Sequence, residues 1–353
     1  MEKGNAEKKR LRIYLAVAYG ITFLMGLLMW YGNARGADVG AFPNAQMMYP
    51  AAGVMLGLLL TKKGDKTLPK GLYILFLLLT AVMIGVSVIS VFAPKSITVN
   101  GITISVWEQI INNVIIIGGI LFWIFLLIAG KEKRKAYGLN WDNWGKSWWC
   151  ILLFILLFFG RTALSCAVSG QLGLLEIILT TPSTWIMIAV LFVNFFLSVP
   201  AFFGEEYGWR YYLQPLLQKK FGLKGGVIVL GVVWGLWHLP VDFFYYTTPD
   251  QGFLAAIGQQ ITCITLGIFF AYAYMKTKNI WVPVVLHFLN NNLAAVLSGG
   301  GADALQNQTY TWSDLLMALV VNALFFGIFI FAGCFRKKRY GKRRGEKRFV
   351  VSG

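Results

Sequence analysis

Long apolar runs separated by short charged segments make up most of this chain. A transmembrane α-helix needs about 20 mostly apolar residues to cross about 30 Å of hydrocarbon. The pattern predicts an all-α fold, a polytopic transmembrane helix bundle of about ten spans, with eight to ten as the range. The runs cover residues 13–31, 46–61, 70–93, 106–130, 147–168, 184–203, 225–246, 253–275, 280–298 and 312–334.

Composition supports a membrane protein. Of the 353 residues, 57% are hydrophobic and only 13% are charged, whereas a soluble domain averages about a quarter charged residues. A water-soluble enzyme and a disordered chain are therefore poor interpretations. The net charge of +17 could suggest nucleic acid, but the basic residues cluster at the ends of apolar runs and form no stripe on an amphipathic face. We expect no nucleic-acid partner.

The basic residues instead predict an orientation, because Lys and Arg beside spans are retained on the cytoplasmic side. With the N-terminus inside, 28 of the 32 basic residues fall in cytoplasmic segments, and the other side receives only Arg35 and Lys95. Both termini are thus predicted to be cytoplasmic, in a multi-pass protein of the bacterial plasma membrane. The polybasic segment 336–353 is expected to contact the headgroups of anionic membrane lipids.

Ionisable residues inside apolar runs are costly and mark candidate functional sites. In the segment Gly204–Arg210, Glu206 and Arg210 are spaced i,i+4 and can pair on a helix. Glu205 points about 100° away from Glu206 and is then the freer carboxylate. Taken alone, this segment is more typical of a charge cluster at a helix end than of catalysis.

The chain has two histidines, and both fall in apolar runs. His238 follows Trp234 by one helical turn, and His287 and Asn291 share a helix face. Each alone fits a buried histidine or a hydrogen bond between membrane helices. Two histidines in spans beside acidic or amide residues weaken that interpretation, because chance placement would favour loops.

Spacing predicts that these groups meet. Glu205 and His238 each lie fourteen residues from a basic turn at residues 219–224, which places both about 21 Å from that turn if the arms are helical. His287, nine residues after Lys278, lies about 13 Å in by the same measure. We expect one site within the bundle, open to the cytoplasmic face.

This arrangement requires a long sixth helix. It should run past its apolar segment, from about Thr184 to Leu217, with Pro200 supplying a kink. Pro215 favours an earlier end or a second kink.

The ordered set of EExxxR at Glu205–Arg210, aromatic-xxxH at Trp234–His238 and HxxxN at His287–Asn291 resembles the motifs of the CPBP family of intramembrane proteases. This family is also called Abi or type II CAAX prenyl endopeptidases. The resemblance covers roughly residues 147–298 and departs from the usual pattern in having Trp234 where Phe is common. It implies hydrolysis of a peptide bond near the C-terminus of a membrane-associated or CAAX-like substrate, which is prenylated in some members, or a part in bacteriocin processing and immunity.

Amide hydrolysis requires an activated water and stabilisation of the developing oxyanion. We assign Glu205 as general base with His238 as its partner, and His287 with Asn291 as oxyanion donors. Glu206 and Arg210 are expected to be supporting residues that hold Glu205. We favour no cofactor and no metal. A Zn²⁺ alternative uses Glu205, His238 and His287 as ligands, with water in the fourth position.

The expected organisation is an N-terminal transmembrane region at residues 1–146, a protease core at 147–298, a final span at 299–335 and a polybasic tail at 336–353. An alternative of another class is a non-catalytic bacteriocin-immunity protein or a transporter, since a buried acid–base cluster also suits a proton-coupled carrier. Against a transporter, the chain shows no repeated half, and its polar groups are concentrated in one part.

Overall fold

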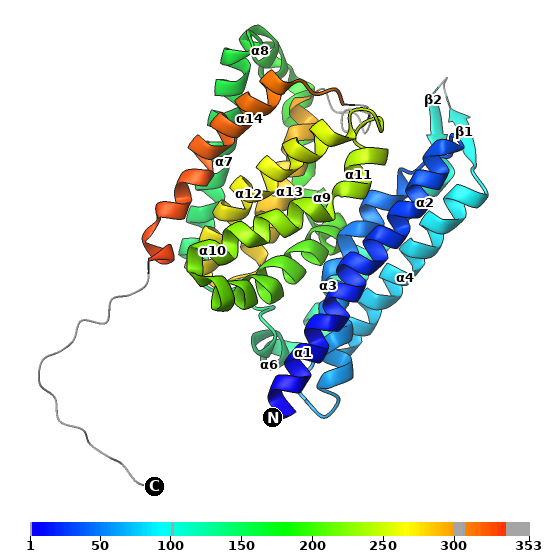
Figure 1. Ribbon diagram of the computed structural model, residues 1–353, viewed down its shortest axis with the longest axis vertical. Coiled ribbons are helices and arrows are strands. Elements are labelled where there is room, and N and C mark those ends of the chain that lie inside the picture. The colour runs from blue at the N-terminus through cyan, green and yellow to red at the C-terminus, as the bar shows by residue number, and fades with distance from the viewer. Residues whose placement is uncertain (1, 100–101, 299–305, 307, 337–353) are drawn as a thin grey trace, which may run out of the picture.

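The computed structural model describes residues 2–99, 102–298, 306 and 308–336, and it is a bundle of long helices (Figure 1). A π-helical segment joins the first two helices into one continuous rod. The elements of the N-terminal part are α1 (Glu2–Leu15), η1 (Ala16–Ile21), α2 (Thr22–Ala34), α3 (Ala41–Thr61), α4 (Lys70–Phe92), β1 (Ser96–Val99), β2 (Ile102–Ser105), α5 (Val106–Ile128) and α6 (Gly130–Ala136).

The C-terminal part contains the helices that carry the three motifs. Two short 3₁₀ turns follow the last α-helix. The elements are α7 (Trp144–Val168), α8 (Leu172–Thr180), α9 (Pro182–Glu206), the π-helix η2 (Tyr207–Leu213), α10 (Gln214–Trp237), α11 (Leu239–Phe244), α12 (Gly252–Thr277), α13 (Trp281–Leu297), α14 (Trp312–Phe325), η4 (Gly327–Phe331) and η5 (Gly333–Phe335).

The all-α membrane bundle is confirmed, and each of the ten expected runs contains a helix. Among the described residues, six helical segments are long and apolar enough to cross a membrane, while α13 and α14 are shorter apolar helices. The count of ten spans stays a prediction. The six segments are Gly4–Ala34, Lys70–Phe92, Val106–Ile128, Trp144–Val168, Pro182–Phe244 and Gly252–Thr277.

One small departure from an all-helical chain is a two-stranded hairpin, in which β1 pairs antiparallel with β2. Its strands read Ser-Ile-Thr-Val and Ile-Thr-Ile-Ser, and the two residues between them are Asn and Gly. Alternating β-branched residues around Asn-Gly are a strong short-range hairpin signal. The prediction from apolar runs did not include this hairpin, because the hairpin lies in the connection between two spans.

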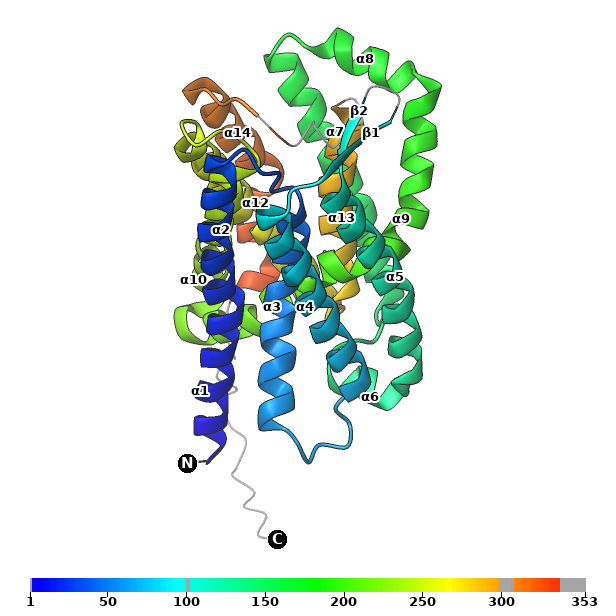
Figure 2. The ribbon, with the colours of Figure 1, turned by 90° about the vertical axis from the view of Figure 1, so that its right-hand side faces the viewer.

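The helices alternate in direction, so the connections gather at two ends of the bundle (Figure 2). The N-terminus, the α3–α4 loop and α6 lie at one end, which we call the basic end, and the β1–β2 hairpin and α8 lie at the other (Figures 1 and 2). Helix α14 begins near α8 and runs in the direction of the basic end (Figure 1). The orientation of both termini in the membrane stays a prediction.

The predicted long helix is present as a continuous helical path through α9, η2 and the start of α10. Pro200 lies inside α9, and the path widens into a π-helix directly after Glu206. Such π-helical turns are often found at functional sites. The chain turns at Gly222, whose φ of 78° and ψ of 169° leave the helical region, within the predicted 219–224 turn.

The α9–η2 segment crosses α3 at very short range through two glycines one turn apart. A Cβ on Gly204 would lie 2.4 Å from the carbonyl oxygen of Met47, and one on Gly208 would lie 2.3 Å from Cβ of Pro50. Small residues at this spacing let membrane helices approach closely. This crossing brings the N-terminal half of α3 beside Glu205.

The N-terminal helices share one hydrophobic core with the motif-bearing helices. Both α3 and α5 pack against α9, and α3 also packs against η2. The expected boundaries at residues 146, 298 and 335 remain predictions. Most of the polybasic tail, residues 337–353, lies outside the described residues.

Candidate active site

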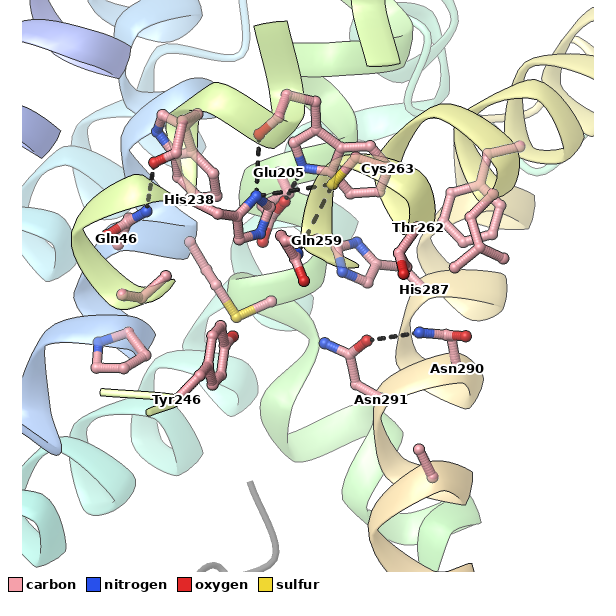
Figure 3. Close-up of a pocket in the computed structure, with 18 of the residues that line it drawn as sticks. Gln46, Glu205, His238, Tyr246, Gln259, Thr262, Cys263, His287, Asn290 and Asn291 are labelled. Atoms are coloured by element: carbon pink, nitrogen blue, oxygen red, sulfur yellow. Dashed lines mark hydrogen bonds between the residues drawn. The ribbon is translucent and has the colours of Figure 1, made fainter. Parts of the chain in front are cut away.

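All four predicted catalytic residues, Glu205, His238, His287 and Asn291, line one cavity of about 190 Å³ (Figure 3). They come from α9, the end of α10, and α13, so residues 86 positions apart in sequence converge because three helices pack together. The volume is large enough for several water molecules beside these side chains, since one water takes about 30 Å³ in the liquid.

Glu205 is 2% exposed and is held by two indole groups. Its Oε2 accepts hydrogen bonds from Nε1 of Trp209, at 3.2 Å, and from Nε1 of Trp234, at 2.8 Å. Both donors use the same oxygen, which leaves Oε1 for a molecule in the cavity. Two fixed donors also restrict the orientation of the carboxylate plane.

Glu206 is fully buried and lies between two groups that can carry positive charge. Its Oε2 is 3.2 Å from Nε of Arg210, which confirms the predicted i,i+4 pair. Its Oε1 is 2.9 Å from Nδ1 of His287. We expected Glu206 and Arg210 to hold Glu205, but the direct contact is with His287, because the splay between adjacent helical residues turns Glu206 toward α13.

Arg210 has no exposed surface, and its guanidinium also lies over an aromatic ring. The distance from its Cζ to the ring centroid of Trp234 is 4.6 Å. A desolvated cation over an indole is favourable by about 2 kcal/mol or more. Trp234 thus contacts both Arg210, through its ring, and Glu205, through its N–H.

His238 caps the end of α10 with its ring beside the cavity. Its Nδ1 lies 2.9 Å from the carbonyl oxygen of Trp234, one turn earlier. Since a carbonyl only accepts, Nδ1 carries the proton in this contact and Nε2 is the basic nitrogen of the neutral ring. The Sγ of Cys263 is a further neighbour, 3.8 Å from Nδ1.

Asn291 is oriented by the neighbouring amide. Nδ2 of Asn290 donates to Oδ1 of Asn291 over 3.1 Å. The amide nitrogen of Asn291 is consequently turned away from Asn290 and toward the cavity (Figure 3). The role of Asn291 as an oxyanion donor stays a prediction.

The zinc alternative needs three grouped ligands. Among the residues that the structure describes, no three His, Cys, Asp or Glu side chains are grouped closely enough to hold a metal ion. The contacts at Nδ1 of the two histidines leave both Nε2 atoms, and a zinc-bound histidine commonly donates its other ring N–H in this way. The zinc site of Glu205, His238 and His287 therefore stays a predicted alternative.

Several residues of the site were not found from the sequence. Trp209 could have been, since it follows Glu205 by one helical turn inside the first motif. The α3 side chains could not, because nothing in their sequence links them to residues 160 positions away. Gln46 donates from Nε2 to the carbonyl oxygen of Trp237 over 3.0 Å. The cavity residues supplied by α3 are Pro43, Gln46 and Met47.

The cavity does not reach the end of the bundle that we expected. Its lining extends to Pro43, Tyr246 and Tyr310, which lie near the starts of α3 and α14 and after α11. These positions belong to the end opposite the basic end (Figures 1 and 2). Equal helical depth from the 219–224 turn was a sound argument for convergence, but it could not say on which side the helices leave a space.

The fold and the cavity define a multi-pass helical membrane protein with a buried carboxylate–histidine site. Residues 181–293 match the family described as type II CAAX prenyl endopeptidase Rce1-like. Residues 181–293 are therefore similar to the CAAX protease family, which is the family that the three motifs resemble. The match contains all six predicted site residues and begins later than the expected boundary at residue 147.

A curated relative supports the same family. The protein named CAAX prenyl protease 2 from Methanococcus maripaludis is 32% identical over 104 residues, which cover 28% of this chain and 38% of the relative. The chain thus matches well under half the length of that relative. No solved structure matches the chain.

Proposed function

We propose that this protein is an intramembrane endopeptidase that hydrolyses a peptide bond in a membrane-associated polypeptide. The family match and the relative's name support a CAAX-type protease. The observation that carries the proposal is the convergence of Glu205, His238, His287 and Asn291 on one cavity, with one atom of each already fixed by a neighbour.

In the proposed first step, Oε1 of Glu205 takes a proton from a water molecule, and the hydroxide attacks the carbonyl carbon of the substrate. His238 helps to position this water through Nε2. A carboxylate in a site sheltered from bulk water is a stronger base than one in solvent, because little hydration opposes its protonation.

The tetrahedral oxyanion then needs donors that are in place beforehand. Nδ2 of Asn291 and Nε2 of His287, with the ring protonated on both nitrogens, supply them. Glu206 holds Nδ1 of His287, and Arg210 balances the charge of Glu206. The C–N bond breaks when Glu205 returns its proton to the leaving amine.

The test is replacement of Glu205 by Gln, with Glu176→Gln as the control because Glu176 is exposed on α8, away from the cavity. Membrane and secreted peptides from cells with and without the protein are compared for new termini. A peptide whose termini depend on the protein is then used as the substrate in the assay. Glu205→Gln should lose processing at normal membrane abundance, while the control keeps it. Unchanged processing in Glu205→Gln rejects catalysis and favours a binding role, as in immunity or transport.

The same substrate decides the metal question. Purified protein is treated with a strong chelator, analysed for bound elements and assayed again. We expect activity to survive in protein that contains no metal. Loss of activity that returns on addition of Zn²⁺ would instead support the zinc version with Glu205, His238 and His287 as ligands.

A further inference from the structure

The mouth of the active-site cavity lies near helix ends that face away from the N-terminus. Pro43 is in the first turn of α3, Tyr246 follows α11, and Tyr310 precedes α14. The cavity residues of α12 and α13 lie toward the same end of the bundle. Gln259 is near the start of α12, and Ala294 is near the end of α13. The catalytic groups are thus reached from one end of the bundle.

The route toward the basic end is closed by packed side chains. The residues that follow Glu205 along the helix, including Tyr207, Trp209 and Arg210, have no exposed surface. The hydroxyl of Tyr207 lies 2.7 Å from that of Tyr73 and donates to the carbonyl oxygen of Tyr137 over 3.0 Å. This buried layer separates the cavity from the basic end.

Charge differs sharply between the two ends. Basic residues on the cavity-mouth side are Arg35 and Lys95, and acidic residues there include Asp38, Glu176 and Asp250. Apart from Arg161 and Arg210 within the bundle and Arg336 at the end of the described chain, the other described basic residues lie in segments toward the basic end. These segments are residues 2–12, 62–70, 131–146, 219–224 and 276–278.

Because membrane insertion retains Lys and Arg in the cytoplasm, the basic end is the cytoplasmic one. From this and the cavity geometry we infer that the active site opens to the extracytoplasmic side of the membrane. If the proposed function holds, the substrate is an exported or membrane-inserted polypeptide whose scissile bond lies at the outer face of the membrane. A lipidated C-terminus in the cytosol would lie on the opposite side of the membrane from the cavity opening.

The cavity lining favours cleavage inside a chain over recognition of a chain end. Besides Glu205 and the two histidines, its described polar side chains are neutral, such as Gln46, Gln259 and Thr262, and none is Lys or Arg. The imidazolium proposed for His287 serves the oxyanion, so the described lining supplies no further cation for a terminal carboxylate, whereas its amide and hydroxyl groups suit the N–H and C=O groups of an extended backbone.

The apolar part of the lining adds a second preference. Met47, Val241, Leu266 and Phe270 face the same space as the polar groups. Burying an apolar side chain of the substrate against them would contribute about 25 cal/mol per Å² removed from water. The expected substrate therefore carries an apolar residue near the scissile bond, as at the outer end of a membrane-anchoring segment.

The test is labelling of single cysteines with a membrane-impermeant thiol reagent. The background replaces the native cysteines by Ala: Cys150, Cys166, Cys263 and Cys334. Asp250→Cys reports the loop at the mouth, Ala294→Cys reports the cavity, and Lys63→Cys is the matched control at the basic end. Each variant is first checked for processing of the substrate, so that labelling is read only from folded protein.

In intact bacterial cells, we expect the reagent to label Asp250→Cys and Ala294→Cys, and to label Lys63→Cys only after permeabilisation. Prior labelling of Ala294→Cys from outside should also abolish processing. The reverse pattern, with Lys63→Cys labelled from outside and the other two protected, overturns the inference. It would leave the proposed protease intact, because loss of processing in Glu205→Gln is measured independently of orientation.

Discussion

The close crossing of α3 with the α9–η2 segment offers a sharp test of how the site is built. Gly204 and Gly208 flank the catalytic and supporting carboxylates, Glu205 and Glu206, on one helical turn. The perturbation is a single methyl group, in Gly204→Ala or Gly208→Ala. A Cβ on Gly204 would lie 2.4 Å from a backbone oxygen of α3, where ordinary contacts are 3.4–4 Å.

Relief of that clash requires the helices to separate by about 1 Å, since a backbone oxygen cannot rotate away as a side chain can. Overpacking of this kind costs about 1–3 kcal/mol. Replacing Gly by Ala inside a helix returns about 1 kcal/mol, so each variant should lose about 0–2 kcal/mol of stability. The double variant should lose less than the sum, because one separation relieves both contacts.

Activity should suffer more than stability. Glu205 moves with its helix while Gln46 and Met47 stay with α3, and a displacement of about 1 Å at a catalytic group can cost about 100-fold in rate. Thermal unfolding in detergent and the rate of substrate processing measure the two effects. The control is Gly85→Ala in α4, whose Cβ meets nothing within 4 Å and should leave both unchanged or slightly raise stability.

The claim that the close crossing positions Glu205 is refuted if Gly204→Ala and Gly208→Ala behave like Gly85→Ala in both assays. Loss of stability with full specific activity would show that the crossing holds the bundle together but does not set the position of Glu205.

Two further substitutions test the groups around the carboxylates. Arg210→Met removes one of the two cationic neighbours of the buried Glu206, and we expect a loss of about 3–5 kcal/mol, seen as lower membrane abundance and a lower unfolding temperature. Wild-type stability would contradict this. Trp234→Phe keeps an aromatic ring at this position but removes the N–H donor to Glu205. The lost charge-assisted bond is worth about 1.5–3 kcal/mol, so kcat should fall about 10- to 100-fold with little change in KM. Trp281→Phe, which removes an indole donor to the carbonyl oxygen of Leu139 outside the cavity, should lower stability and leave kcat unchanged.

The Trp234 contact gives a different meaning to the motif's departure from the usual Phe. As a sequence feature it is an aromatic-for-aromatic exchange that removes no catalytic group. In the structure the indole N–H reaches Glu205 on another helix, and the ring lies under Arg210. A change that is neutral within one helix acquires a role through the helix packed beside it.

The sequence by itself determined the features that obey local rules. Apolar runs of sufficient length become membrane helices, the i,i+4 spacing pairs Glu206 with Arg210, and basic residues beside spans predict orientation. Equal arm lengths around the 219–224 turn correctly predicted that Glu205 and His238 lie beside the same cavity.

Only the tertiary structure decided which helices share a face. The pairing of Glu206 with His287, the contribution of Gln46 and Met47 from α3, and the end at which the cavity opens all depend on how separate helices pack. Packing is set by close contacts such as those at Gly204 and Gly208, where a backbone can approach only because a side chain is missing. Hydrophobic runs are nearly alike around the helix and do not specify these partners.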